Sequence, residues 1–226
     1  MADAGVPAPF ALVIFDCDGV LVDSETIINR VFARMLGEHG LALTPQETAE
    51  LFTGKANAEC LALAGAMLGR PLPAGFAADY DERARAALAA EVRAMPGIAE
   101  ALDALDVPCA VASNGGHAKM RVTLGRAGLL HRFEGRLFGV EDVPRPKPAP
   151  DLYLHAARTL GVPPAACAVV EDSPTGVAAG VAAGMTVFGF AAHTPRARLR
   201  EAGAHAVFDA MAGLPALLRA APARPG

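Results

Sequence analysis

Residues 11–25 read ALVIFDCDGVLVDSE and carry the strongest signal for the fold. Five apolar residues end abruptly in Asp16 and Asp18, which are separated only by Cys17. A short, fully apolar run is typical of a strand that is buried on both faces of a parallel sheet. Side chains two residues apart in an extended segment point the same way, so we expect the two carboxylates to project together and Cys17 to point opposite. The stretch therefore predicts a buried strand that brings two acids to one place.

Five further apolar runs of strand length follow, and each is followed by a segment of helix length. They occupy residues 107–113, 136–140, 166–171, 185–190 and 206–208. Strands that alternate with helices are typical of a parallel sheet covered by helices on both faces. The sequence therefore predicts an α/β fold with a doubly wound, Rossmann-like parallel sheet as its core.

The segment between the first and second predicted strands breaks this alternation. Residues 24–94 hold no convincing strand and are rich in Ala, Leu, Glu and Arg at helical spacing. Pro96 and Gly97 then mark the return to the core. We expect an all-helical cap domain at residues 24–94, inserted into a core domain formed by residues 1–23 and 95–226.

Composition excludes several classes of partner. The 226 residues carry a net charge of −4 with scattered arginines, which argues against a nucleic-acid surface. No segment approaches the roughly 20 unbroken apolar residues of a membrane span. The amino terminus has neither the basic region nor the long apolar stretch of a secretory signal, so we expect a cytoplasmic protein. We expect a small-molecule substrate, and a chain that is a monomer or a weak homodimer.

Polar residues follow three more of the predicted strands. Ser113 and Asn114 end the second, Lys147 lies between prolines in RPKPAPD, and Glu171 and Asp172 end the strand at residues 166–171. Each group alone could be an ordinary turn, a helix cap or a solvated loop residue. In open α/β sheets, however, ligands bind beyond the carboxyl ends of the strands. Their joint occurrence at four such positions favours one shared site.

The chemistry of these side chains predicts a metal and a phosphate. Like charges about 4 Å apart repel by roughly 4 kcal/mol at an effective dielectric of 20, so clustered carboxylates need a cation. Oxygen ligands suit Mg²⁺, which keeps waters and a substrate phosphate among its ligands, although Mn²⁺ stays open. Lys147, Ser113 and the helix starts are then available for the remaining phosphate oxygens. The set is typical of phosphoryl transfer.

Four motifs, DCDGVLVDSE, SNGG, RPKPAPDLY and EDSPTG, resemble in order those of the haloacid dehalogenase (HAD) superfamily. The helical insertion resembles its C1-type cap, and the core is similar to that of the β-phosphoglucomutase-like subfamily. The resemblance implies Asp16 as the nucleophile and Asp18 as the general acid/base. It implies substrate or phosphate contacts by Ser113, Asn114 and Lys147, and Mg²⁺ ligation by Asp16, Asp18 (through its backbone carbonyl), Glu171 and Asp172.

Within that superfamily the residues favour a phosphatase. Asp18 argues against a dehalogenase proper, because a departing halide needs no protonation of an oxygen. The related mutases carry a histidine on the first cap helix and an arginine in a cap loop, and Ile28 and Asn57 occupy these places here. The stretches SNGGHAKM, LHAAR and FTGKAN resemble bacterial sugar-acid phosphatases of the 6-phosphogluconate type. We expect Lys55 in the cap to contact an anionic substrate.

Two other functions stay open at this point. A β-phosphoglucomutase-type mutase is one alternative. A phospho-aspartate signalling module similar to response-regulator receivers uses the same residue types, but there the acidic pair ends the first strand and no cap is inserted. We expect His117 to be a surface residue at a helix start, and Tyr153 to serve in packing.

Overall fold

The computed structural model describes residues 9–52 and 57–221. Its core is a six-stranded parallel sheet with the order β3-β2-β1-β4-β5-β6. Each strand lies within one of the predicted runs: β1 (Leu12–Phe15), β2 (Cys109–Ala112), β3 (Leu137–Phe138), β4 (Cys167–Glu171), β5 (Thr186–Phe190) and β6 (Ala206–Phe208). The strand order reverses beside β1, which confirms the predicted doubly wound sheet.

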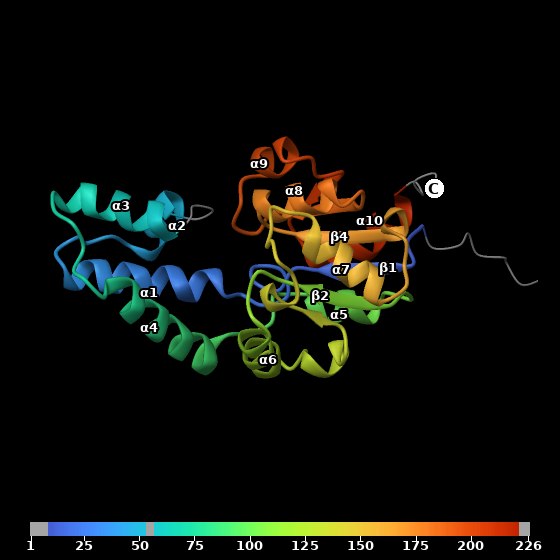
Figure 1. The fold of residues 1–226 in the computed structure, drawn as a ribbon, viewed down its shortest axis with the longest axis horizontal. Coiled ribbons are helices and arrows are strands. Elements are labelled where there is room, and N and C mark those ends of the chain that lie inside the picture. The colour runs from blue at the N-terminus through green and yellow to red at the C-terminus, as the bar shows by residue number, and fades with distance from the viewer. Residues whose placement is uncertain (1–8, 53–56, 222–226) are drawn as a thin grey trace, which may run out of the picture.

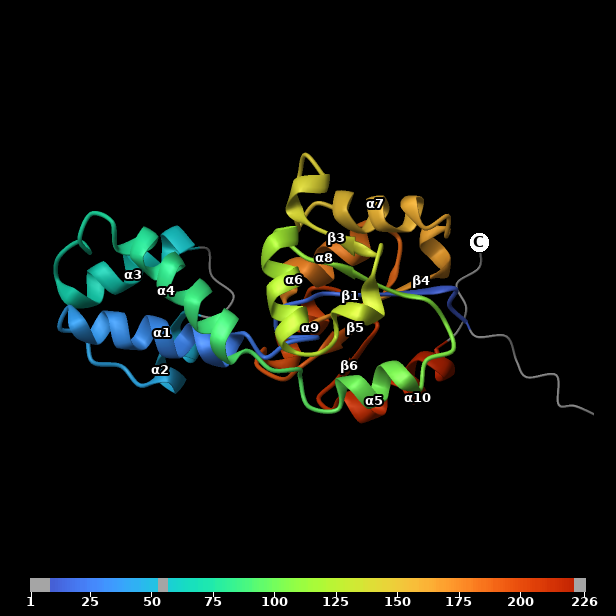
Figure 2. The same ribbon diagram turned by 90° about the horizontal axis from the view of Figure 1, so that it is seen from below.

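Helices cover both faces of this sheet (Figures 1 and 2). On β1, Val13 and Phe15 pack on one face, while Leu12 and Ile14 pack on the other. The first face is covered by α5 (Ile98–Asp103), α6 (His117–Arg126) and α10 (Leu214–Ala220), the second by α7 (Asp151–Thr159), α8 (Pro174–Ala182) and α9 (Arg196–Glu201). Within the described part of the core there are also four short 3-10 helices: η1 (Leu130–Phe133), η2 (Val140–Asp142), η3 (Pro164–Ala166) and η4 (Met211–Gly213).

A separate helical lobe extends from one end of the core (Figure 1). It consists of α1 (Glu25–Glu38), α2 (Pro45–Phe52), α3 (Asn57–Leu68) and α4 (Phe76–Glu91), which confirms the predicted helical cap. The cap has its own small core, in which the ring of Phe32 meets Phe52 and Tyr80 edge-on at 5.1 Å and Phe76 at 6.0 Å. Across both described stretches of chain, no helix combines the length and apolar character needed to cross a membrane.

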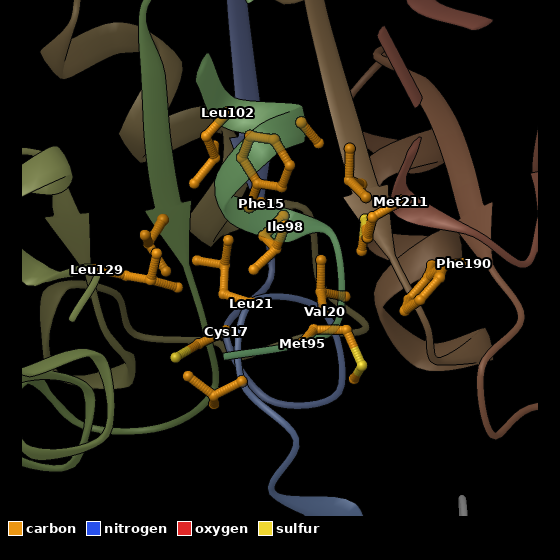
Figure 3. Packing of buried hydrophobic residues seen from close by; sticks show 14 of the residues in the cluster. Phe15, Cys17, Val20, Leu21, Met95, Ile98, Leu102, Leu129, Phe190 and Met211 are labelled. Carbon is orange, nitrogen blue, oxygen red and sulfur yellow. The ribbon is translucent and has the colours of Figure 1, made fainter. Parts of the chain in front are cut away.

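Two linkers join the cap to the core, and they pair with each other. Val22 forms an antiparallel bridge with Ala94, and the amide of Met95 donates to the carbonyl of Leu21 at 2.9 Å. Leu21 and Met95 are buried in the core together with Val20, beside Phe15 at the end of β1 (Figure 3). The predicted domain bounds at residues 23/24 and 94/95 fall in this paired segment and stay a prediction.

Candidate active site

The first part of the site forms where β1 ends. The amide of Asp16 extends the ladder by donating to the carbonyl of Val170 at 2.9 Å. The chain then turns at Gly19, whose φ of +76° is in the left-handed region that favours glycine. A Cβ at Gly19 would also overlap with the Asp172 carboxylate. Glycine therefore lets the loop after β1 approach the end of the neighbouring strand, β4.

Three buried carboxylates meet at this edge of the sheet. Asp16, Glu171 and Asp172 each offer an oxygen within 4.8 Å of the others. Burial raises the pKa of Asp16 from 3.8 to about 7, an effect that Glu171 reinforces and Lys147 opposes. Burial also raises the pKa of Asp172 well above its ordinary value, and Glu171 and Asp16 raise it further. A divalent cation such as Mg²⁺ fits these oxygen ligands, because it would compensate the negative charge that burial of Asp16 and Asp172 otherwise disfavours.

Lys147 supplies a positive charge inside this group. Its Nζ donates to Asp16 Oδ1 at 2.7 Å, to Glu171 Oε1 at 2.6 Å and to the carbonyl of Ala112 at 2.8 Å. The same nitrogen lies 4.7 Å from the centre of the Tyr153 ring. Burial alone would lower the pKa of Lys147, but the carboxylates of Asp16 and Glu171 outweigh it and raise the pKa well above its ordinary value. The amine therefore stays protonated beside Asp16.

Glu171 is held by groups from two helices. Tyr153 on α7 donates its hydroxyl to Glu171 Oε1 at 2.9 Å. Ser173, the N-cap of α8, donates its amide and its hydroxyl to Oε2 at 3.1 and 3.0 Å. Gly176 leaves room for this carboxylate, because a Cβ there would overlap with it. Tyr153 therefore does more than the packing that we expected, since it fixes an acidic side chain of the site.

The loop after β2 supports Lys147 from the other side. Ser113 is buried, and its Oγ accepts a hydrogen bond from the amide of Gly115 at 3.0 Å. Asn114 donates from Nδ2 to the carbonyl of Lys147 at 3.1 Å and accepts at Oδ1 from the Lys147 amide at 2.9 Å. Both polar ends of Asn114 thus hold the backbone of Lys147. The expected phosphate contacts of Asn114 and of Ser113 stay predictions.

Asp18 has a different partner from Asp16. Its Oδ2 accepts from Lys119 Nζ at 2.7 Å, and its side chain is not part of the group formed by Asp16, Glu171 and Asp172. Burial alone would lower the pKa of Lys119, but the carboxylate of Asp18 outweighs it and raises this pKa. The predicted ligation of Mg²⁺ by the Asp18 backbone carbonyl stays a prediction.

Lys119 and Glu25 were not among the residues predicted for this site. Burial raises the pKa of Glu25, the first residue of α1, and the nearby Asp18 raises it further. The start of the first cap helix therefore lies close to Asp18. One available signal for Lys119 was its position in the first turn of the helix that follows SNGG. Lys55 lies outside the described residues, and its role stays a prediction.

His117 is part of a small polar cluster beside the loop after β2. Its Nε2 lies 2.7 Å from Asp142 Oδ2, and its amide donates to the Glu141 carboxylate. Asp142 also accepts from the amide of Gly139 at 2.8 Å. His117 is the first residue of α6, as expected, and its contacts with Glu141 and Asp142 link α6 to η2.

Comparisons with known proteins agree with this geometry. Residues 10–184 match the haloacid dehalogenase-like hydrolases. The chain is 38% identical over 182 residues to the 6-phosphogluconate phosphatase of Escherichia coli (strain K12), which covers 80% of this chain and 82% of that protein. It is 35% identical over 193 residues to hexitol phosphatase A of the same organism, with coverages of 83% and 86%. A HAD-family hydrolase from Deinococcus radiodurans R1, solved with bound phosphate and sodium, is 40% identical with a TM-score of 0.83, covering 93% of this chain and 96% of that chain.

The order of the motifs, the inserted cap and these matches lead to one family. The receiver alternative is excluded, because the match extends through the cap and the relatives are phosphatases. The buried carboxylates and Lys147 lie together at the carboxyl ends of the strands, where open α/β sheets bind their ligands. This chain therefore belongs to the haloacid dehalogenase-like hydrolases, in the β-phosphoglucomutase-like subfamily, and is a phosphatase that hydrolyses phosphoric monoesters.

Proposed function

We propose that this phosphatase hydrolyses a small phosphorylated sugar or sugar acid, such as 6-phosphogluconate, through an aspartyl phosphate formed on Asp16. The observation that carries the proposal is the buried contact of 2.7 Å between Asp16 Oδ1 and Lys147 Nζ at the carboxyl end of β1. It holds a carboxylate in a fixed orientation where a phosphate oxygen can also meet the ammonium group.

The reaction has two half-reactions. In the first, a carboxylate oxygen of Asp16 forms a bond to phosphorus, the ester bond breaks, and Asp18 gives its proton to the departing sugar oxygen. In the second, water attacks the phosphorus of the aspartyl phosphate, Asp18 takes a proton from that water, and Asp16 is released with inorganic phosphate. One carboxyl group thus serves as acid and then as base. Lys147 and Ser113 hold the phosphoryl oxygens in place during both steps.

The proposed cation is Mg²⁺. Asp16, Glu171 and Asp172 would hold it with their carboxylates, and Asp18 with its backbone carbonyl. When bound, it neutralises negative charge on the transferring phosphoryl group. The three buried carboxylates support this assignment, since burial of Asp16 and Asp172 otherwise disfavours their charged forms.

The proposed substrate class rests on two supports. Two relatives are named for 6-phosphogluconate and hexitol phosphates. Ile28, which occupies the place of the mutase histidine, packs against the hydrophobic core of this chain and offers no proton-transfer group. Both favour release of phosphate over its return to the sugar. Lys55 would then meet the acid group of the substrate.

Phosphate release with Mg²⁺ across a panel of phosphorylated sugars and sugar acids tests this proposal, with the Asp16→Asn variant as the blank. We expect release from a sugar-acid phosphate that is absent in the variant, and a higher KM for that substrate in Lys55→Met. Isomerised hexose phosphate without net phosphate release would instead identify a mutase. Release that persists in Asp16→Asn would remove Asp16 as the nucleophile.

Three further parts of the proposal need measurements of their own. Activity with Mg²⁺ and with Mn²⁺ at cellular concentrations identifies the metal. Sedimentation tests the expected monomer or weak homodimer, and fractionation tests the expected cytoplasmic location.

A further inference from the structure

Each of the two aspartates after β1 has an ammonium partner of its own. Lys147 binds Asp16 from the loop before α7, and Lys119 binds Asp18 from the first turn of α6, both at 2.7 Å. The first pair is almost fully buried, whereas the side chains of Lys119 and Asp18 are 37% and 22% exposed. None of the four motif roles assigned above includes Lys119.

The path of the Lys119 side chain explains how it reaches Asp18. A Cβ built on Gly115 would lie 3.5 Å from Asp18 Oδ2 and also 3.5 Å from Lys119 Cδ. Both side chains therefore pack against the same turn, which also holds Ser113. Lys119 thus links Asp18 to the phosphate-binding turn that follows β2.

We propose that Lys119 is a positioning residue that holds the Asp18 carboxyl group where it exchanges protons with the leaving oxygen and with water. This inference rests on the proposed function, because it assigns Lys119 a part in both proton transfers of that mechanism. Asp18 follows a strand and sits in a turn, and its Oδ1 has no hydrogen-bond partner among the described residues. Lys119 is therefore the contact that fixes its orientation.

A purely structural role explains this pair less well. This ion pair is only partly buried, so solvent still screens it in part, and ordering two side chains costs entropy; we therefore expect its net contribution to stability to be small. Removal of the Lys119 charge should therefore leave the fold intact. Its effect should be confined to steps in which Asp18 handles a proton.

The leaving group separates positioning of Asp18 from a general effect on the site. A simple alkyl ester such as glycerol 2-phosphate needs protonation of its leaving oxygen, whereas 2,4-dinitrophenyl phosphate releases a stable phenolate and does not. In Lys119→Met we expect kcat/KM to fall by about ten- to hundredfold for the alkyl ester and by less than about threefold for the aryl ester. Lys119→Arg should recover part of the loss, because it keeps a cation within reach of Asp18.

The second half-reaction gives an independent readout. With the aryl ester, Lys119→Met should form phospho-Asp16 rapidly and hydrolyse it slowly, so a burst of dinitrophenolate should precede a slower steady state. Arg121→Met is the matched control, since Arg121 is exposed on the same helix and should leave both esters unaffected. Binding of inorganic phosphate and thermal unfolding should be unchanged in Lys119→Met.

Equal losses with the two esters, no loss with either, or a gain in kcat/KM would overturn the role of Lys119. Failure of the proposed mechanism looks different. In that case the wild-type enzyme itself would form no phosphoenzyme on Asp16, and Asp16→Asn would retain turnover of the aryl ester.

Discussion

The fold buries the carboxyl group of Asp16, and this makes the free energy of unfolding depend on pH. Burial raises its pKa from 3.8 to about 7, so the folded protein binds this proton more tightly than the unfolded chain does. The resulting stability is present below the unfolded pKa and is lost as pH rises through the folded pKa. Metal-free protein should therefore become less stable between pH 3.8 and about 7.

Replacing Asp16 tests this linkage. Metal-free Asp16→Asn should be more stable than wild type near about pH 8 and should differ less near about pH 5, with about 4 kcal/mol as the upper bound. Excess Mg²⁺ should remove most of the difference by stabilising the wild-type carboxylate. Urea unfolding with EDTA or with Mg²⁺ at both pH values measures it. The same pH dependence in wild type and variant would contradict the assignment.

Tyr153 carries a hydroxyl whose value can be measured separately from its ring. Tyr153→Phe keeps the packing but removes the donor at 2.9 Å from Glu171 Oε1. Because hydrogen bonds to charged groups contribute about 1.5–3 kcal/mol, we expect a loss of stability of that order together with lower phosphatase activity. Tyr80→Phe is the control, since Tyr80 is the other tyrosine and its ring packs against Phe32 in the cap. Equal effects of the two changes on activity would contradict a role for the Tyr153 hydroxyl.

Helix α8 begins next to Glu171, and its first turn has no room for a side chain at Gly176. Alanine in a helix is favoured over glycine by about 1 kcal/mol, yet Gly176→Ala should lower both stability and activity, because its Cβ would displace the Glu171 carboxylate. Gly125→Ala in α6 is the matched control, since the nearest atom to its Cβ would be at an ordinary 3.8 Å. Thermal unfolding and phosphate release of the two variants compare them. A stabilised, fully active Gly176→Ala would refute the close contact.

The strands and helices also show which parts of the fold and of the site could be predicted from the sequence. Apolar runs in the sequence located the six strands found among the described residues, because a buried parallel strand has no polar face. They did not set the strand ends: residues 136–140 were predicted, but only Leu137–Phe138 pair, with Val111 and Ala112. Strand ends also located the acids and Lys147. The site contacts of Tyr153 and Lys119 were not predicted, because both side chains reach the site from helices. The spacing of residues along a helix does not show which groups a side chain will contact.

The cap and the core also contact each other outside the two linkers. Arg126, at the end of α6, donates from Nε and Nη2 to the carbonyl of Ala90, near the end of α4, at 3.1 and 2.9 Å. The carbonyls in the last turn of a helix have no hydrogen-bond donor within that helix, and Arg126 supplies a donor for one of them. It therefore fixes the end of α4 against the core beside the paired linkers.

Arg126→Met should loosen this end of the cap without changing the core. We expect a loss of stability of about 1 kcal/mol, the net value of a typical hydrogen bond. Relative to wild type, amide exchange should become faster in residues 88–94 and should change less in β1 and β4. Arg121→Met, which changes an exposed arginine on the same helix, should leave exchange in that segment unchanged. Hydrogen exchange read by mass spectrometry resolves the three segments. If exchange became faster to the same extent in residues 88–94 and in β1 and β4, Arg126 would be stabilising the whole fold. The contact with Ala90 would then not be what holds the end of α4 against the core.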